Sequence, residues 1–390
     1  MLDANLQNKI VQYLLKYVKE NQVELFRLNQ KCTQDTNYWI TKDYESVLSY
    51  LENFEHDKNN RLIKPKGDIL IITSYNEPLI LSIIPVLNAI LAGNSVVLKP
   101  SRKSFLITDA IWRQSGIMEK YNLKLNIIKI NQESELESHI KSVVAVYFFG
   151  GLNTAKKISK ICAEHFVEFI PEIEAADCMV INYKEHSHIN NELIESIFHQ
   201  SFSHAGQSCQ RIQGVYVQQD NFAEFERILK EKFHIFVNSS EVSNYIDKNF
   251  KVSQNIYEEL IKDVNNSLSK EVLVQDQRLI LVNSPEKDSE YVAKAYFFPS
   301  LWFVSYESKE ELIKYLSARK FRLGLNIQTD DKDFRKDLIE NTNYSRYTIN
   351  STHIKVRKGE GWGGMWPSGY FGYKSWLSHF VNSYTILDKD

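Results

Sequence analysis

The sequence contains four cysteines whose thiols could act as strong nucleophiles, namely Cys32, Cys162, Cys178 and Cys209. They are widely spaced, which argues against a disulfide framework and a cysteine-based zinc site, so we expect no bound metal. Cys209 ends the segment HAGQSC, in which Gly206 would let the backbone approach a bound group. A thiol, with an unperturbed pKa of about 8.5, becomes a strong nucleophile when a neighbouring dipole or base favours the thiolate. By residue type alone, however, each cysteine is more typical of inert core packing.

Short apolar segments alternate with helical ones from Gly67 onward. DILIIT, SVVLKP, KLNIIKI, VVAVYFF and VEFI are typical of strands, and helical patterns run through residues 78–92, 105–118 and 154–166 between them. Parallel neighbours need long crossover connections, so this order predicts an α/β fold with doubly wound parallel sheets. A second run of strands and helices after about residue 172 predicts a second α/β domain.

The opening 60 residues read as helices, because Ile10, Leu14 and Val18 recur at helical spacing, and we interpret them as a layer for packing and assembly. A formal net charge of -2 supplies no general attraction to nucleic acid or to an anionic membrane. The N-terminus lacks the regions of a signal peptide, and the longest apolar run, residues 79–92, is shorter than the roughly 20 residues of a membrane span. We therefore expect a cytoplasmic protein that acts on a small molecule.

A set of motifs from about Lys66 to Tyr384 resembles the aldehyde dehydrogenase superfamily in both order and spacing. The most specific match is Ala92-Gly93-Asn94 leading into Val96-Val97-Leu98-Lys99-Pro100-Ser101. The other matching segments are Tyr75-Asn76-Glu77-Pro78 for the family's Trp-Asn-Phe-Pro turn, Phe148-Phe149-Gly150-Gly151, Glu172-Ile173-Glu174-Ala175-Ala176 for Glu-Leu-Gly-Gly-Lys, Gly206-Gln207-Ser208-Cys209, and Gly363-Gly364-Met365-Trp366-Pro367-Ser368-Gly369 for Gly-Gly-x-Lys-x-Ser-Gly. The resemblance implies two domains with doubly wound parallel sheets. Residues 1–172 would hold the N-terminal helices and an NAD(P)-binding domain, completed by about 370–390, and residues 173–369 the catalytic domain.

The resemblance also implies catalytic roles for three residues. The Cys209 thiolate would attack a carbonyl carbon, and the Cys209 backbone N–H and the Asn76 side-chain amide would stabilise the oxyanion. Glu172 would be the general base that activates Cys209 or the hydrolytic water, a task suited to a carboxylate whose pKa is raised by partial burial. Taken alone, Glu172 could equally be a solvated carboxylate at a strand edge, and Glu168 and Glu174 crowd the same segment.

Cofactor residues follow from the same resemblance. Lys99 and Ser101, at the end of a strand, would contact the adenosine ribose or a phosphate, and Gly150 and Gly151 would lie at the cofactor pyrophosphate. Many members have a glutamate after Lys-Pro-Ser, where this chain has Arg102 and Lys103, so the sequence favours NADP over NAD, with use of both as an alternative. Arg102 could equally be a solvated residue at a helix start.

Two further departures concern the nicotinamide and assembly. The family's Glu-x-Phe-Gly-Pro element appears as Ala295-Tyr296-Phe297-Phe298-Pro299, so Phe297 remains as a cofactor contact whereas the glutamate for the nicotinamide ribose is missing. Little sequence is left between the opening helices and Lys66 for a bridging hairpin. The oligomeric state is therefore open, with the C-terminal segment 383–387 as a candidate strand for a homodimer.

We expect NAD(P)-dependent oxidation of an aldehyde to a carboxylic acid through a thiohemiacetal and a thioester on Cys209. The first alternative is reduction of a fatty acyl-CoA or another acyl thioester to an aldehyde, although Glu172 favours hydrolysis of the thioester. The second is a catalytically impaired homologue with a binding role, suggested by Ala295. A thiol hydrolase that pairs Cys209 with His199 or His204 is the weakest reading, because no group to orient the imidazole is evident. The substrate itself is not readable, since Trp362 and Trp366 could line an apolar tunnel or belong to the core.

Overall fold

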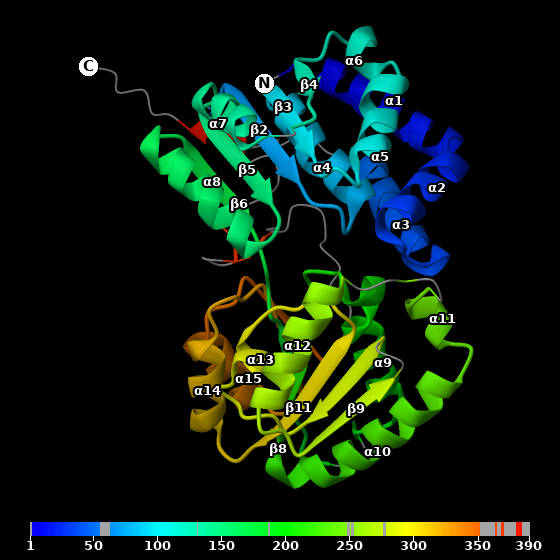
Figure 1. Cartoon of the computed structure of the whole chain (residues 1–390), viewed down its shortest axis with the longest axis vertical. Coiled ribbons are helices and arrows are strands. Elements are labelled where there is room, and N and C mark those ends of the chain that lie inside the picture. Colours follow the sequence, from blue (N-terminus) through cyan, green and yellow to red (C-terminus); the bar gives the residue numbers. More distant parts are fainter. Residues whose placement is uncertain are drawn as a thin grey trace.

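Two parallel sheets, one above the other, form the framework of the chain (Figure 1). The computed structural model describes residues 2–54, 63–130, 132–185, 188–247, 250, 253–275, 278–351, 363–364, 368–369 and 380–383. The first sheet has the order β4-β3-β2-β5-β6, and all its neighbouring strands are parallel. Its strands are β2 (Asp68–Thr73), β3 (Ser95–Pro100), β4 (Leu125–Ile127), β5 (Ala145–Phe149) and β6 (Glu168–Glu172).

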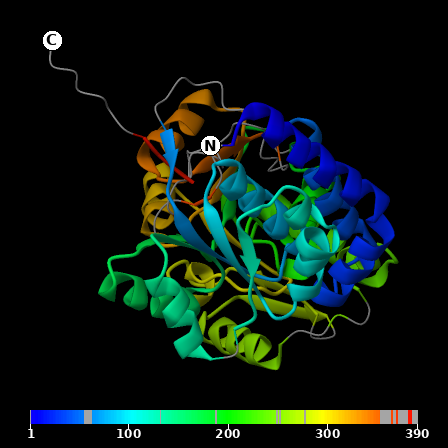
Figure 2. The same cartoon turned by 90° about the horizontal axis from the view of Figure 1, so that it is seen from above.

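Helices cover both faces of this sheet, as Figure 2 shows from above. One face packs against α4 (Pro78–Leu91) and the N-terminal helices α1 (Ala4–Glu20), α2 (Gln22–Thr33) and α3 (Asn37–Glu52). The other face packs against α7 (Glu133–Lys141) and α8 (Leu152–Glu164). Alternate strand residues point to opposite faces, so Ile71 belongs to the first core and Leu70 to the second.

The single helix predicted over residues 105–118 is wrong. The segment divides into α5 (Phe105–Asp109), a π-helical turn (Ala110–Gln114) and α6 (Ile117–Lys120). Gly116 has a φ of 74°, which a right-handed helix cannot accommodate, so the chain must restart there. The apolar spacing extends through the break because Ile107, Ile111 and Ile117 all enter the same core.

The second sheet has the order β13-β12-β7-β8-β11-β10-β9 and is parallel except for β9, which pairs antiparallel with β10 at one edge. Its strands are β7 (Cys178–Asn182), β8 (Gly214–Gln218), β9 (Glu271–Gln275), β10 (Leu279–Asn283), β11 (Ser300–Tyr306), β12 (Gly324–Thr329) and β13 (Arg346–Ile349). α9 (Asn191–Ser201) and α10 (Gln219–Asn238) cover one face, and α12 (Gln254–Asn266), α14 (Lys309–Ala318) and α15 (Lys332–Asn341) the other. The short helices α11 (Val242–Tyr245) and α13 (Glu290–Ala293) complete this part. The prediction of two parallel sheets, each with helices on both faces, is confirmed.

A short two-stranded sheet joins distant parts of the sequence. β1 (Ile63–Pro65) pairs antiparallel with β14 (Val381–Ser383). Just before β14, Phe380 is buried against Tyr147, and its carbonyl accepts a hydrogen bond of 2.9 Å from the Asn94 side chain. The described C-terminal residues thus lie against the first sheet, whereas a domain boundary near residue 172 stays a prediction. Within the described ranges, no helix is both long enough and apolar enough to span a membrane.

Candidate active site

The segment that carries Cys209 begins with a strained turn. After α9, a short 3-10 segment (Ser203–Gly206) places His204, Ala205 and Gly206 at φ values of 50°, 52° and 75°, in the left-handed region. A Cβ on Gly206 would lie 2.2 Å from the carbonyl carbon of Phe298, so only glycine fits. The backbone that packs against Gly206 is the chain's own Phe298–Pro299 peptide. The approach of a bound group to this glycine stays a prediction.

Asn76 reaches this segment from the turn after β2. Its side-chain amide donates a hydrogen bond of 3.0 Å to the carbonyl of Gln207, and its Oδ1 accepts one of 2.7 Å from Ser74. The residue is buried, so both contacts fix the orientation of the amide. An amide nitrogen carries two hydrogens, and the contact with Gln207 uses one of them.

Cys209 differs from the other three cysteines in its access to solvent. Cys32, Cys162 and Cys178 are buried, whereas Cys209 is partly exposed. Burial of the sulfur raises the pKa of the Cys209 thiol well above its usual range, and Glu77, Glu172 and Asp177 raise it further, against a smaller opposing effect of Arg346. The resting residue is therefore a thiol, and a neighbouring base must remove its proton before it can attack.

Glu172 is the last residue of β6, and its carboxylate lies in a cradle of glycines. The Gly364 N–H donates a hydrogen bond of 2.6 Å to Glu172 Oε1. A Cβ on Gly363 would lie 2.3 Å from Glu172 Oε2, and one on Gly369 would lie 2.6 Å from it. Gly363, Gly364 and Gly369 therefore lie against the carboxylate of Glu172. Residues 365–367 of this element, including Trp366, lie outside the described residues, as does Trp362.

Burial raises the pKa of Glu172 to about 8, although the Gly364 N–H and Arg346 lower it, and Asp177 raises it. The direction agrees with the one expected for a general base that works near neutral pH. Because Glu172 and Cys209 each respond to Asp177 and Arg346, and Glu172 acts on Cys209 directly, the carboxylate and the thiol share one electrostatic environment.

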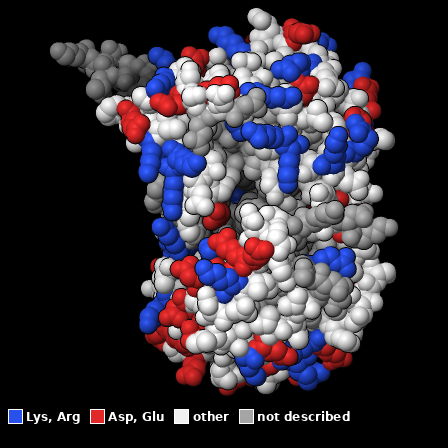
Figure 3. Space-filling model, viewed as in Figure 1, with Lys and Arg blue, Asp and Glu red and all other residues white. Residues whose placement is uncertain are grey.

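The predicted cofactor residues form two groups. The first lies at the carboxyl end of β3. Lys99 is half-buried, and burial, followed by repulsion from Arg102, lowers its pKa. Ser101 exchanges a hydrogen bond of 2.7 Å with Ser104, and Arg102 is exposed. On the face drawn in Figure 3, Lys and Arg side chains border a hollow between the upper and lower parts of the molecule.

The second group lies where α8 begins. Gly151 is the residue that precedes α8, and the Gly150 N–H donates to the Glu172 carbonyl at 3.1 Å. The Glu174 carboxylate accepts a hydrogen bond of 2.9 Å from the Leu152 N–H, the first amide of the helix. Phe297, partly exposed, belongs to the segment that packs against Gly206.

These donors fit a phosphate-bearing dinucleotide, with one conflict. Lys99 and Arg102 are cationic donors suited to a phosphate. The Glu174 carboxylate on the Leu152 amide shows that the start of α8 accepts an oxyanion, as the positive end of a helix does. A cofactor phosphate at this helix would have to displace that carboxylate.

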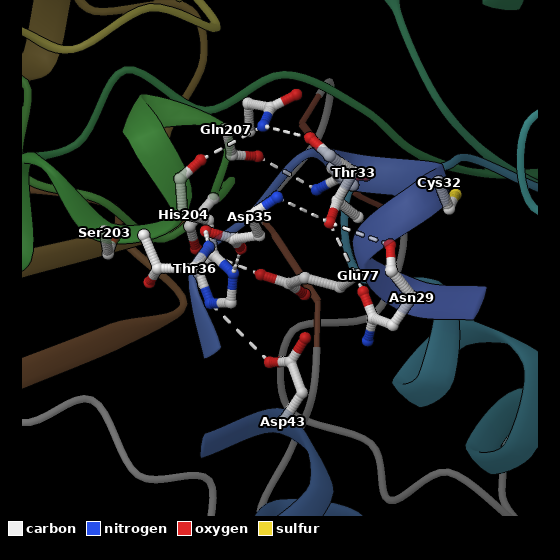
Figure 4. Close-up of polar contacts among 12 residues, drawn as sticks. Asn29, Cys32, Thr33, Asp35, Thr36, Asp43, Glu77, Ser203, His204 and Gln207 are labelled. Atoms are coloured by element: carbon white, nitrogen blue, oxygen red, sulfur yellow. Dashed lines mark hydrogen bonds and ion pairs between the residues drawn. The ribbon is translucent and has the colours of Figure 1, made fainter. Parts of the chain in front are cut away.

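Asp35, Asp43 and Glu77 were missed as neighbours of this segment, and His204 was considered only as a partner of Cys209 in a thiol hydrolase. His204 lies between Asp35 and Asp43 of the N-terminal segment (Figure 4). Glu77 accepts a hydrogen bond of 3.1 Å from the hydroxyl of Ser208. The one available signal was Glu77, a carboxylate where the resemblance expects phenylalanine. Both ring nitrogens of His204 face aspartates, which leaves neither of them to deprotonate Cys209. His199 Nε2 lies 2.8 Å from the Tyr38 hydroxyl.

The chain thus has a two-sheet α/β fold, with a thiol on which the Glu172 carboxylate acts and an amide that contacts the backbone two residues before that thiol. The chain matches the model of the aldehyde dehydrogenase family over residues 16–388. It therefore belongs to the aldehyde dehydrogenase family.

Curated relatives are distant. A 4,4'-diapolycopene aldehyde oxidase of Methylomonas sp is 28% identical over 43% of this chain and 31% of its own length. A chloroplastic member of aldehyde dehydrogenase family 3 of Arabidopsis thaliana is 23% identical over 81% of this chain and 58% of its own. The 4,4'-diaponeurosporen-aldehyde dehydrogenase of Staphylococcus aureus is 23% identical over 86% of this chain and 73% of its own. The chain thus spans less than two thirds of the first two relatives.

Solved structures share the fold. An oxidoreductase from Marinobacter aquaeolei superposes with a TM-score of 0.83 at 16% identity, over 99% of this chain and 86% of that one. The betaine aldehyde dehydrogenase from Staphylococcus aureus, in complex with NAD+, gives 0.80 at 18% identity, over 97% and 81%. Both superpositions cover nearly the whole chain, so the predicted aldehyde dehydrogenase-type fold is confirmed.

Proposed function

We propose that this chain is an NAD(P)-dependent aldehyde dehydrogenase that oxidises an aldehyde to a carboxylic acid. Two contacts near Cys209 support this proposal: the Asn76 amide donates to the Gln207 carbonyl, and the Glu172 carboxylate acts electrostatically on the Cys209 thiol. Asn76 follows the carboxyl end of β2 and Glu172 ends β6, and ligands of α/β proteins bind at the carboxyl ends of such strands. Of the four cysteines, all within the described ranges, Cys209 is the one residue that is not fully buried.

The proposed reaction begins when the Cys209 thiol loses its proton to Glu172 and the sulfur attacks the aldehyde carbon. The carbonyl oxygen becomes an oxyanion, which the second Asn76 amide hydrogen and the Cys209 backbone N–H stabilise. Glu172 then releases the Cys209 proton to solvent, which restores the carboxylate. In a second step it takes a proton from a water molecule, whose oxygen attacks the thioester carbon. The C–S bond breaks, the acid leaves, and Cys209 recovers its proton.

When bound, the nicotinamide dinucleotide supplies the acceptor for the aldehyde hydride, which converts the thiohemiacetal to the thioester. Lys99, Ser101 and Arg102 would hold its adenosine ribose or a phosphate, the turn at Gly150 and Gly151 its pyrophosphate, and Phe297 would lie near its nicotinamide. Arg102 and Lys103, two cations in sequence, favour NADP, with NAD as an alternative.

The substrate class in this proposal is suggested by the names of two relatives. Two curated relatives are named for 4,4'-diapolycopene and 4,4'-diaponeurosporen aldehydes. Aldehydes of this kind therefore belong among the substrates tested. A homodimer and a cytoplasmic location, both expected from the sequence, stay predictions.

The test is to incubate the purified chain with NAD+ or NADP+ and short aliphatic, aromatic and long polyene aldehydes, and to follow the absorbance of the reduced cofactor. The Cys209→Ala variant should lose all activity, whereas the matched variant Cys162→Ala, at a buried cysteine of α8, should keep it. If no aldehyde reacts but acyl-CoA oxidises the reduced cofactor, the chain is an acyl thioester reductase. Silence in both directions would leave the impaired homologue, to which the missing glutamate at Ala295 points.

A further inference from the structure

We propose that His204 is a positioning residue of the proposed dehydrogenase: with Asp35 and Asp43 of the N-terminal segment it holds the left-handed turn that presents Cys209. This inference rests on the proposed function for its catalytic consequence. It assigns the N-terminal helices, which the sequence suggested only as a packing layer, a part in the active site.

The first support is the geometry around the imidazole (Figure 4). His204 Nδ1 lies 2.6 Å from Asp35 Oδ2, and His204 Nε2 lies 3.6 Å from Asp43 Oδ1. Side-chain exposure is 8% for His204, 2% for Asp35 and 7% for Asp43. A buried charged side chain is strongly disfavoured unless an opposite charge pairs with it, so each member of the cluster depends on the others.

The second support is the backbone of the turn. His204 and Ala205 both have positive φ, a region that residues with a Cβ seldom adopt in succession. Such a conformation persists only when surrounding contacts over-determine it. The ion pair with Asp35 fixes the first residue of this turn, and the Phe298–Pro299 peptide packs against its end at Gly206.

The third support is that contacts with α2 and with the turn after β2 continue to the residue before Cys209. The Gln207 side-chain amide donates to the Thr33 carbonyl at 3.4 Å, and the Gln207 carbonyl accepts from Asn76. The Ser208 hydroxyl donates to Glu77 Oε1 at 3.1 Å. A shift at His204 would therefore be transmitted to Cys209 and to the amide of Asn76 together.

The charge of His204 suits a structural ion pair better than proton transfer. Burial alone would lower the pKa of the imidazole, but Asp43 and Asp35, with a further effect of Glu77, outweigh burial and raise it to about 10. Burial also raises the pKa of Asp43 well above its usual range. His204 thus stays an imidazolium across the neutral range, held by its contact with Asp35.

The experiment compares wild type with His204→Gln and Asp35→Asn, and uses His199→Gln as the matched control on the same stretch of chain. His199 also contacts a residue of α3, Tyr38, but lies outside the ion cluster. We expect kcat per folded molecule to fall at least tenfold in His204→Gln and at least threefold in Asp35→Asn, with the KM for the cofactor within twofold of wild type. Amide hydrogen exchange of residues 203–209 should become at least tenfold faster in His204→Gln, and β8 and β11 should keep their protection. His199→Gln should match wild type in both measurements.

Two results would overturn the proposal: an unchanged kcat per folded molecule with unchanged exchange at residues 203–209, or a uniform loss of protection across the whole chain. If His204→Gln does not fold, Asp35→Asn carries the same test, because it removes the charge and keeps the shape of the side chain. If wild type itself neither oxidises an aldehyde nor reduces an acyl thioester, the proposed function fails. The exchange measurement still decides whether His204 holds the turn.

Discussion

Replacing Glu172 by glutamine should make the protein inactive and, at high pH, more stable. Burial raises the pKa of this carboxyl from 4.5 to about 8, so the native state holds a proton that the unfolded state releases. Stability that depends on this proton is fully present below pH 4.5 and is lost as the pH rises toward 8. Glutamine cannot ionise, yet its carbonyl oxygen can still accept the hydrogen bond of the Gly364 N–H.

The magnitude follows from the difference between the two pKa values. At about 1.4 kcal/mol per pKa unit, the full difference corresponds to roughly 5 kcal/mol once Glu172 is ionised in both states. The advantage of Glu172→Gln should therefore be below about 1 kcal/mol at pH 5 and approach roughly 5 kcal/mol above pH 8.

Urea unfolding of wild type and Glu172→Gln between pH 5 and pH 9 measures this difference. The matched control is Glu164→Gln, at an exposed glutamate of α8, whose effect should not grow with pH. In parallel, the rate of acid production by wild type should rise with pH toward a midpoint near 8, because the base acts in its ionised form. A stability difference that is constant across this pH range would refute the argument that burial raises the pKa of Glu172. Full acid production by the glutamine variant would refute its role as the base.

Three further predictions concern other parts of the site and core. Lys99→Met should raise the KM for the cofactor at least tenfold while kcat stays within about threefold, as steady-state kinetics would show, since Lys99 is proposed to bind and not to react. Gly214→Ala should destabilise the chain by about 2–3 kcal/mol in thermal unfolding, because its Cβ would lie 1.9 Å from the Trp302 ring in a closely packed core; an unchanged melting temperature would contradict this. Glu77→Gln should shift the pH midpoint for alkylation of Cys209 by iodoacetamide to lower pH, since the Glu77 carboxylate raises the pKa of that thiol; an unmoved midpoint would show that Glu77 does not act on it.

The framework of the fold could be predicted from local sequence. Segments such as 68–73 and 95–100 are apolar strands bounded by polar residues, and their spacing leaves room for one crossover helix each, so the parallel order followed. The break at Gly116 was missed because apolar periodicity is the same on both sides of it. When a helix breaks but its apolar residues still face the same core, the spacing of apolar residues in the sequence does not reveal the break.

The candidate site was predictable only where it repeats the family's motifs. Asn76, Glu172 and Cys209 were found by resemblance, and their convergence depends on strand order. The contact between His204 and Asp35 joins residues 169 positions apart, and neither belongs to a motif. Such a pair can be read from sequence only if covariation is known, because charge alone does not say which buried aspartate meets which histidine.

Three departures of this chain from the family's motifs add or remove a carboxylate. Together they change the electrostatics of the site. Glu77 and Glu174 stand where the resemblance expects phenylalanine and glycine, and Ala295 stands where it expects glutamate. Glu77 raises the pKa of Cys209, and Glu174 occupies the first amide of α8. Both added charges oppose a step that the proposed reaction needs, thiolate formation in the first case and phosphate binding in the second. A bound phosphate that displaces Glu174 would therefore have to be compensated by nearby cations, of which Lys156 and Lys294 already act on that carboxylate. The cost of that displacement should appear as weak cofactor binding, and not as slow chemistry at Cys209.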